Sequence, residues 1–173
     1  MNSIPTGRVT KEADGSYDLI LTRSFRAGIE DVWASVTDPE RTAHWYGTWK
    51  GEAGPGKTID VQMGFEEGAP WSAMTIDSCR EPQHLALSAV DDYGAWHLEV
   101  NLTENDGVTD LEFIQHRIDP GMVESIGPGW EYYLDNLVAS RDELPLPDFH
   151  DYYPSQSAYF VAQLEAVAGQ SET

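Results

Sequence analysis

Positive charge and cysteine are scarce in this sequence. Against 30 acidic residues stand only 10 lysines and arginines, so the formal net charge is -20 at pH 7. Such a surface repels phosphate backbones and anionic lipid, and no segment clusters basic residues among aromatic ones. Cys79 is the only cysteine, so no internal disulfide can form. The composition argues against nucleic acid as a partner and against a disulfide-stabilised secreted scaffold.

Long apolar runs are also missing. No segment approaches the roughly 18 consecutive apolar residues that a membrane-spanning helix needs, and residues 1–16 hold no signal-peptide-like run. We therefore expect no membrane partner and a cytoplasmic location. Metal-ligand spacings, nucleophile motifs and glycine-rich phosphate loops are absent too, so the sequence predicts no metal site, no cofactor and no assigned catalytic residue.

The length and the apolar content suit one domain. With 173 residues, of which 40% are hydrophobic, the chain can bury a substantial core. We expect residues 1–16 to form a flexible leader, residues 17–142 to form the domain, and residues 143–173 to form a C-terminal extension with a short helix.

Hydrophobic periodicity predicts the elements of that domain. Residues 17–25 alternate as a strand does, and apolar residues at helical spacing over 29–36 predict a helix that ends at Asp38-Pro39, before a second short helix. From residue 48 to residue 117, turn residues separate successive strand-like segments. A capping residue and proline at Asp119-Pro120 begin a long helix, which Gly127-Pro128-Gly129 is expected to kink or interrupt.

This order predicts an α+β fold. We expect a curved antiparallel sheet of about six to seven strands wrapped around the long C-terminal helix, two short helices after the first strand, and an extra C-terminal helix. A curved sheet that wraps a helix tends to leave space between the two, and small apolar molecules bind in such space.

Alternation and helix spacing place ten candidate ligand-binding residues on the inner surface. Any one of them can equally be ordinary core, but together they supply more large rings than a minimal core needs. The amide of Gln115 must find a hydrogen-bond partner there, for which a ligand or a trapped water would serve. The candidates are Trp45, Met63, Trp71, Trp96, Phe113, Gln115, Trp130, Tyr133, Leu134 and Leu137.

A series of short landmarks in a fixed order resembles the START-like (SRPBCC) superfamily, and within it the branch named after the activator of heat-shock-protein ATPase homologue. The resemblance implies a helix-grip fold with a hydrophobic cavity, which the superfamily uses for lipids, hormones and polyketides. The landmarks include Leu21–Ala27, Val32-Trp33, Thr37–Glu40, Trp45, Gly54–Gly56, Glu81-Pro82, Thr109–Phe113 and Gly129-Trp130.

Three functions remain open from the sequence. The first is binding of a small hydrophobic, lipid-like or polyketide-like ligand in an internal cavity. The second is a cyclase or hydratase acting on such a molecule, with His44 or Tyr133 moving a proton. The third is a co-chaperone-like interaction module with a filled interior and an exposed patch, for which the sequence itself offers no chaperone-binding motif. The C-terminal extension could also mediate a homodimer.

Overall fold

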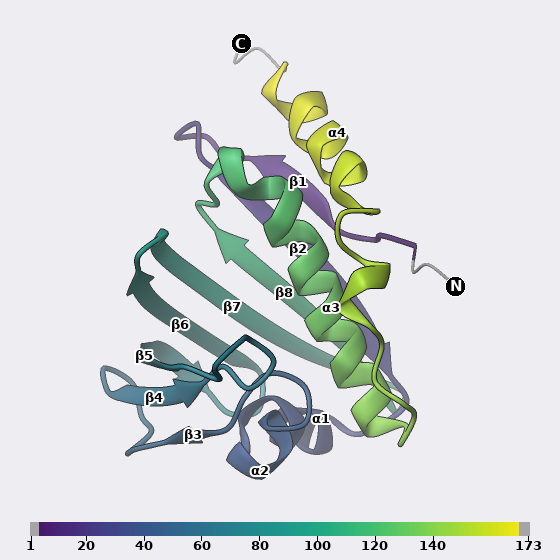
Figure 1. Ribbon diagram of the computed structural model, residues 1–173. Coiled ribbons are helices and arrows are strands. Elements are labelled where there is room, and N and C mark those ends of the chain that lie inside the picture. The colour runs from purple at the N-terminus through teal and green to yellow at the C-terminus, as the bar shows by residue number, and fades with distance from the viewer. Residues whose placement is uncertain (1–3, 170–173) are drawn as a thin grey trace.

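The computed structural model describes residues 4–169, and its centre is one antiparallel sheet of eight strands (Figure 1). The strand order across the sheet is β1-β2-β8-β7-β6-β5-β4-β3. The strands are β1 (Arg8–Lys11), β2 (Tyr17–Phe25), β3 (Trp49–Lys50), β4 (Thr58–Gln62), β5 (Trp71–Arg80), β6 (His84–Asp91), β7 (Gly94–Asn105) and β8 (Val108–His116).

The helices cover one face and one end of this sheet. The long α3 (Val123–Arg141) lies across the inner face over β2 and β8, while α1 (Ile29–Thr37) and α2 (Pro39–Thr42) lie at one end (Figure 1). The last helix, α4 (Ser157–Ala168), packs on α3 and β1 of its own chain. Short 3-10 turns, Pro120–Met122 and Phe149–Asp151, lie before α3 and between α3 and α4. Within residues 4–169, no helix has the length and apolarity to span a membrane.

Part of the expected leader is a strand. Residues 8–11 form β1, which pairs with β2 and buries Val9, so the sheet has eight strands rather than six to seven. The alternation that reveals a strand needs several residues, and β1 offers only one large apolar side chain. The expectation of a loose segment was therefore wrong at these positions.

The expected interruption of the long helix is also absent. Helix α3 runs through Gly127-Pro128-Gly129, although a proline inside a helix removes one backbone hydrogen bond. The glycine at position 127 has a packing reason, because a Cβ there would collide with the ring of Phe160 from α4. Close contact between α3 and α4 therefore requires a residue without a side chain.

A buried charged group joins α3 to the sheet, to the segment before β1 and to the segment between α3 and α4. Arg23 of β2 lies 3.1 Å from Glu131 and 3.0 Å from Asp135, both on α3. The hydroxyl of Thr6 donates to Glu131 at 2.7 Å, and the hydroxyl of Tyr152 donates to Asp135 at 2.7 Å. Because Glu131 is almost fully buried, its carboxylate has lost its contact with water, and these contacts offset the free-energy cost of that loss.

Candidate functional site

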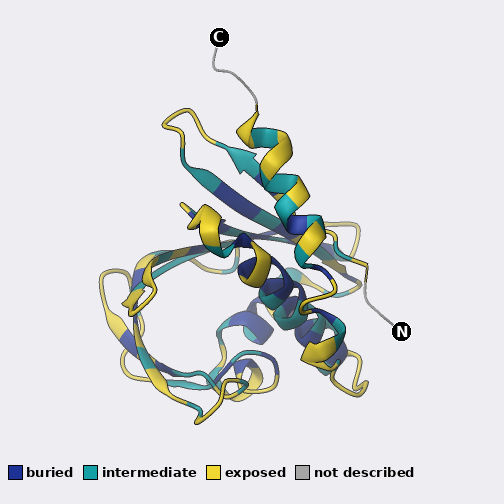
Figure 2. Cartoon of the chain, turned by 45° about the horizontal axis from the view of Figure 1, so that its top comes forward, coloured by how far each residue is buried: buried dark blue, intermediate teal, exposed yellow. Residues whose placement is uncertain are grey.

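Helix α3 covers only part of the inner face of the sheet. Figure 2 shows the sheet curling into a nearly closed ring on one side of the long helix. The buried apolar residues accordingly form two separate clusters: a large one around α3, and a small one on β4 and β5. Tyr46, Cys79, Leu85 and Leu87 pack against both clusters and bridge the space between them.

That space is a cavity of about 550 Å³. Its walls come from α1 and α2, from residues 45–49, from the inner face of β4–β8 and from the middle of α3, and most of its lining side chains are aliphatic or aromatic. The size and apolarity are those of a site for a small organic molecule. The apolar lining includes Trp33, Val36, Trp45, Tyr46, Trp49, Ile59, Val61, Met74, Ile76, Leu85, Leu87, Leu98, Val100, Leu111, Phe113, Trp130 and Leu134.

The mouth of the cavity is marked by lining residues that are exposed to solvent. These residues are Glu30 and Asp38 at the two ends of α1, Ala53 after β3, and Glu81 after β5. Three of the four are carboxylic acids. Negative charge therefore surrounds the opening to the apolar interior.

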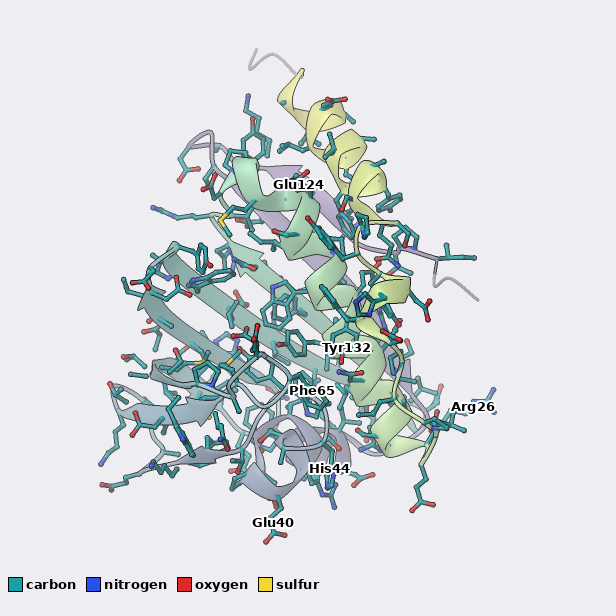
Figure 3. All side chains as sticks on the ribbon, viewed as in Figure 1. Arg26, Glu40, His44, Phe65, Glu124 and Tyr132 are labelled. Atoms are coloured by element: carbon teal, nitrogen blue, oxygen red, sulfur yellow. The ribbon has the colours of Figure 1, made fainter. Side chains whose placement is uncertain are left out.

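The far side of the curled sheet is joined to α3 by the loop between β4 and β5. Phe65 in this loop lies against α3, with its ring 6.4 Å from those of Tyr132 and Tyr133 at near-perpendicular angles (Figure 3). Edge-to-face contacts of this kind are favourable beyond the area that they bury. They hold the β4–β5 hairpin against α3.

Hydrogen bonds fix the tryptophan walls. The ring N–H of Trp45 and that of Trp49 donate to backbone oxygens of α1, at 2.8 and 2.7 Å. The ring N–H of Trp130 donates to the side-chain oxygen of Gln115 at 2.7 Å. Because each polar N–H is used inside the protein, these rings present apolar surface to the cavity.

Four of the ten predicted residues line the cavity: Trp45, Phe113, Trp130 and Leu134. Two more lie in the core behind the wall. Leu137 is fully buried, and the side-chain oxygen of Gln115 accepts a hydrogen bond from the ring N–H of Trp130. This hydrogen bond gives the buried amide one protein partner, and contact between Gln115 and a ligand stays a prediction.

The other four predicted residues lie outside the lining. Trp71 is 47% exposed and its ring lies under the ammonium of Lys50, at 4.2 Å, so its assignment to the inner surface was wrong. Met63 packs against the smaller core cluster, and Trp96 packs against the larger one. Tyr133 is half-buried, with its ring 5.0 Å from that of Tyr46.

Sequence reasoning missed most of the aliphatic lining and three aromatic residues. Tyr46 and Trp49 lie just after α2, and Trp33 was assigned only to the apolar stripe of its helix. The pairs Ile59/Val61, Met74/Ile76 and Leu85/Leu87 each alternate on the inner face of successive strands. That alternation was a usable signal, but large rings received more weight than the period-two pattern.

The histidines do not enter the cavity. His44 is exposed beside α1 and α2 (Figure 3) and is not part of the lining. His97 is exposed on the outer face, where His116 hydrogen-bonds Asp18 at 2.9 Å and Glu99 at 2.7 Å. Burial disfavours the charged form of His116, but these two carboxylates outweigh burial and raise its pKa above 6.5.

Comparison with solved structures gives several proteins of this fold. CalU16 from Micromonospora echinospora is 22% identical with a TM-score of 0.74, over 94% of this chain and 98% of that one. BPP1335 from Bordetella parapertussis is 20% identical with a TM-score of 0.67, over 95% and 94%. DynU16, described as a putative protein in the dynemicin biosynthetic locus, is 20% identical with a TM-score of 0.64, over 79% of this chain and 50% of that one.

These likenesses confirm the helix-grip, START-like fold that the resemblance predicted. No curated protein matches the chain significantly. Residues 26–140 match the model of a family described as Activator of Hsp90 ATPase homolog 1-like protein. This match spans both short helices, strands β3–β8 and nearly all of α3, and therefore nearly every wall of the cavity. The chain belongs to the Activator of Hsp90 ATPase homolog 1-like family.

Proposed function

We propose that the protein binds a small, largely apolar molecule in this cavity. The observation that carries the proposal is a cavity of about 550 Å³ with predominantly apolar, aromatic-rich walls. Burial of a ligand against such walls supplies affinity at roughly 25 cal/mol per Å² of apolar surface. One structural neighbour is described as a putative protein in a biosynthetic locus, which is compatible with a small organic ligand.

The interaction-module alternative fits less well. It predicts a filled interior, whereas the two core clusters leave a cavity between them. The connection between α3 and α4 does expose Leu144, Leu146, Phe149 and Tyr153. Those side chains lie on the outside of the molecule, so their exposure leaves the cavity unexplained.

The test is native mass spectrometry of the purified protein, followed by a thermal-shift screen of fatty acids, sterols and polycyclic aromatic compounds. A ligand at one hundred times its Kd stabilises the native state by about 2.7 kcal/mol, which raises the Tm of a chain of this size by about 5 to 10 °C. A co-purified mass or a saturable shift supports the proposal. No bound mass and no concentration-dependent shift would contradict it.

A matched pair of variants locates the binding site. Val100 lines the cavity from β7, so Val100→Trp places a large ring inside it and should abolish the thermal shift. Val90, on β6, is 80% exposed outside the cavity, so Val90→Trp makes the same chemical change and should leave the shift intact. Equal shifts in both variants would place the ligand elsewhere.

A further inference from the structure

Most polar donors in the cavity wall already have partners. The ring N–H groups of Trp45, Trp49 and Trp130 donate to protein oxygens, as described above. Tyr46 differs from them. It lines the cavity, yet its hydroxyl makes no hydrogen bond to any residue in the range 4–169. A hydroxyl without a protein partner, on a residue that lines the cavity, favours a ligand that can accept its hydrogen bond.

The ring of Tyr46 is held in place on three sides. It lies 5.6 Å from Trp45, is stacked at 5.8 Å on Trp130, and meets Tyr133 edge-on at 5.0 Å. Burial raises the pKa of Tyr46 well above its ordinary value of 10, and the nearby Tyr133 and Glu66 act in the same direction. The hydroxyl is thus a fixed, neutral donor throughout the physiological pH range.

Charge around the cavity disfavours an anion. Within the described part of the chain, no lysine, arginine or histidine contributes to the lining. The ionisable lining groups at the mouth are instead the acids Glu30, Asp38 and Glu81. A carboxylate or phosphate ligand would pass these charges and then lose its hydration without meeting a countercharge.

We propose that the cavity selects an uncharged, largely aromatic molecule that carries a carbonyl oxygen, and that this oxygen accepts a hydrogen bond from the hydroxyl of Tyr46. The inference rests on the proposed function, because it names the chemical class of ligand for the same cavity. Tyr46 orients the ligand, while the apolar walls supply most of the affinity.

Three matched probes test the inference by fluorescence titration. They are the methyl ketone of anthracene, its isopropyl analogue, in which a methyl group replaces the carbonyl oxygen, and the anthracene carboxylate. One net hydrogen bond corresponds to about a five- to tenfold difference in Kd. We expect the ketone to bind the unmodified protein that much more tightly than the isopropyl analogue, and the carboxylate to bind most weakly.

Two tyrosine variants provide the control. Tyr46→Phe keeps the ring and removes the hydroxyl, so the ketone and the isopropyl analogue should bind it equally. Tyr133→Phe removes a hydroxyl from a ring that packs on Tyr46 but does not line the cavity, so the preference should persist. Near-ultraviolet circular dichroism of both variants checks that the aromatic packing is retained.

The outcomes separate the two proposals. If ketone and isopropyl analogue bind the unmodified protein equally, if the preference survives in Tyr46→Phe, or if the carboxylate binds most tightly, the inference is wrong while cavity binding stands. If none of the three probes binds while the thermal-shift screen gives a saturable shift with another compound, the inference is wrong and cavity binding stands. If neither the probes nor the screen gives binding, both proposals are overturned.

Discussion

Replacing Gly127 by alanine should destabilise the protein, although alanine is the better helix former. Gly127 lies in α3 directly under Phe160 of α4, whose side chain is fully buried. A Cβ at position 127 would lie 2.5 Å from both Cδ atoms of that ring, far inside van der Waals contact. Helix α4 or its phenylalanine must therefore move when the methyl group is added.

The expected magnitude is a balance of two terms. Alanine gains about 1 kcal/mol over glycine inside a helix. Displacing a buried phenylalanine loses up to the roughly 3 to 5 kcal/mol that Phe→Ala substitutions cost in cores. The net loss in free energy of unfolding should therefore be about 2 to 4 kcal/mol, measured by urea denaturation monitored by circular dichroism.

Two further variants make this prediction specific to the contact. Gly129 lies in the same helix with open space where a Cβ would be added, so Gly129→Ala should be neutral or slightly stabilising. In a Phe160→Ala background, Gly127→Ala should lose its penalty, because the ring that it strikes is gone. If Gly127→Ala alone proved as stable as the unmodified chain, the close packing of α4 on α3 would be refuted.

Two other predictions concern charged groups. Glu131→Gln removes a buried partner of Arg23 and should lower the free energy of unfolding by about 2 to 3 kcal/mol, whereas the exposed Glu165→Gln should have little effect in the same urea titration. The raised pKa of His116 predicts a contribution to stability that is complete below pH 6.5 and is lost as pH rises through the folded-state pKa. His116→Gln should reduce the dependence of the urea midpoint on pH between pH 6 and 9, whereas the exposed His97→Gln should leave that dependence unchanged. If the midpoint changed with pH equally in the two variants, this role of His116 would be refuted.

Much of the fold could be predicted because its elements are long and regular. The strand over 17–25, the helix over 29–36 and the long helix after Asp119 all show clear periodicity in the sequence. The short β1 and the two-residue β3 fall below the length at which a period can be recognised. Their strand character comes from pairing with neighbours, which is a tertiary effect.

The candidate site was harder to predict because it depends on strand phase and on distant partners. Met74 and Ile76 set the inward phase of β5, and Trp71 is out of phase with them, so counting along the strand would have placed it outside. The register shift between Ile76 and Ser78 then returns Cys79 to the cavity, which alternation alone cannot anticipate. The partner of Gln115 is fifteen residues away on another element.

The cavity itself follows from how the fold divides its apolar surface. Because α3 packs over β2 and β8, the inner face of β4–β7 keeps side chains such as Leu85, Leu87 and Val100 only partly buried. Larger side chains there would fill the space and gain contacts, so an interior left open forgoes stability that the same backbone could provide. A protein that keeps its interior accessible to a ligand therefore has less stability than its fold could provide. Val100→Trp therefore separates ligand binding from folding stability, because it should remove ligand binding while the unliganded protein keeps its fold.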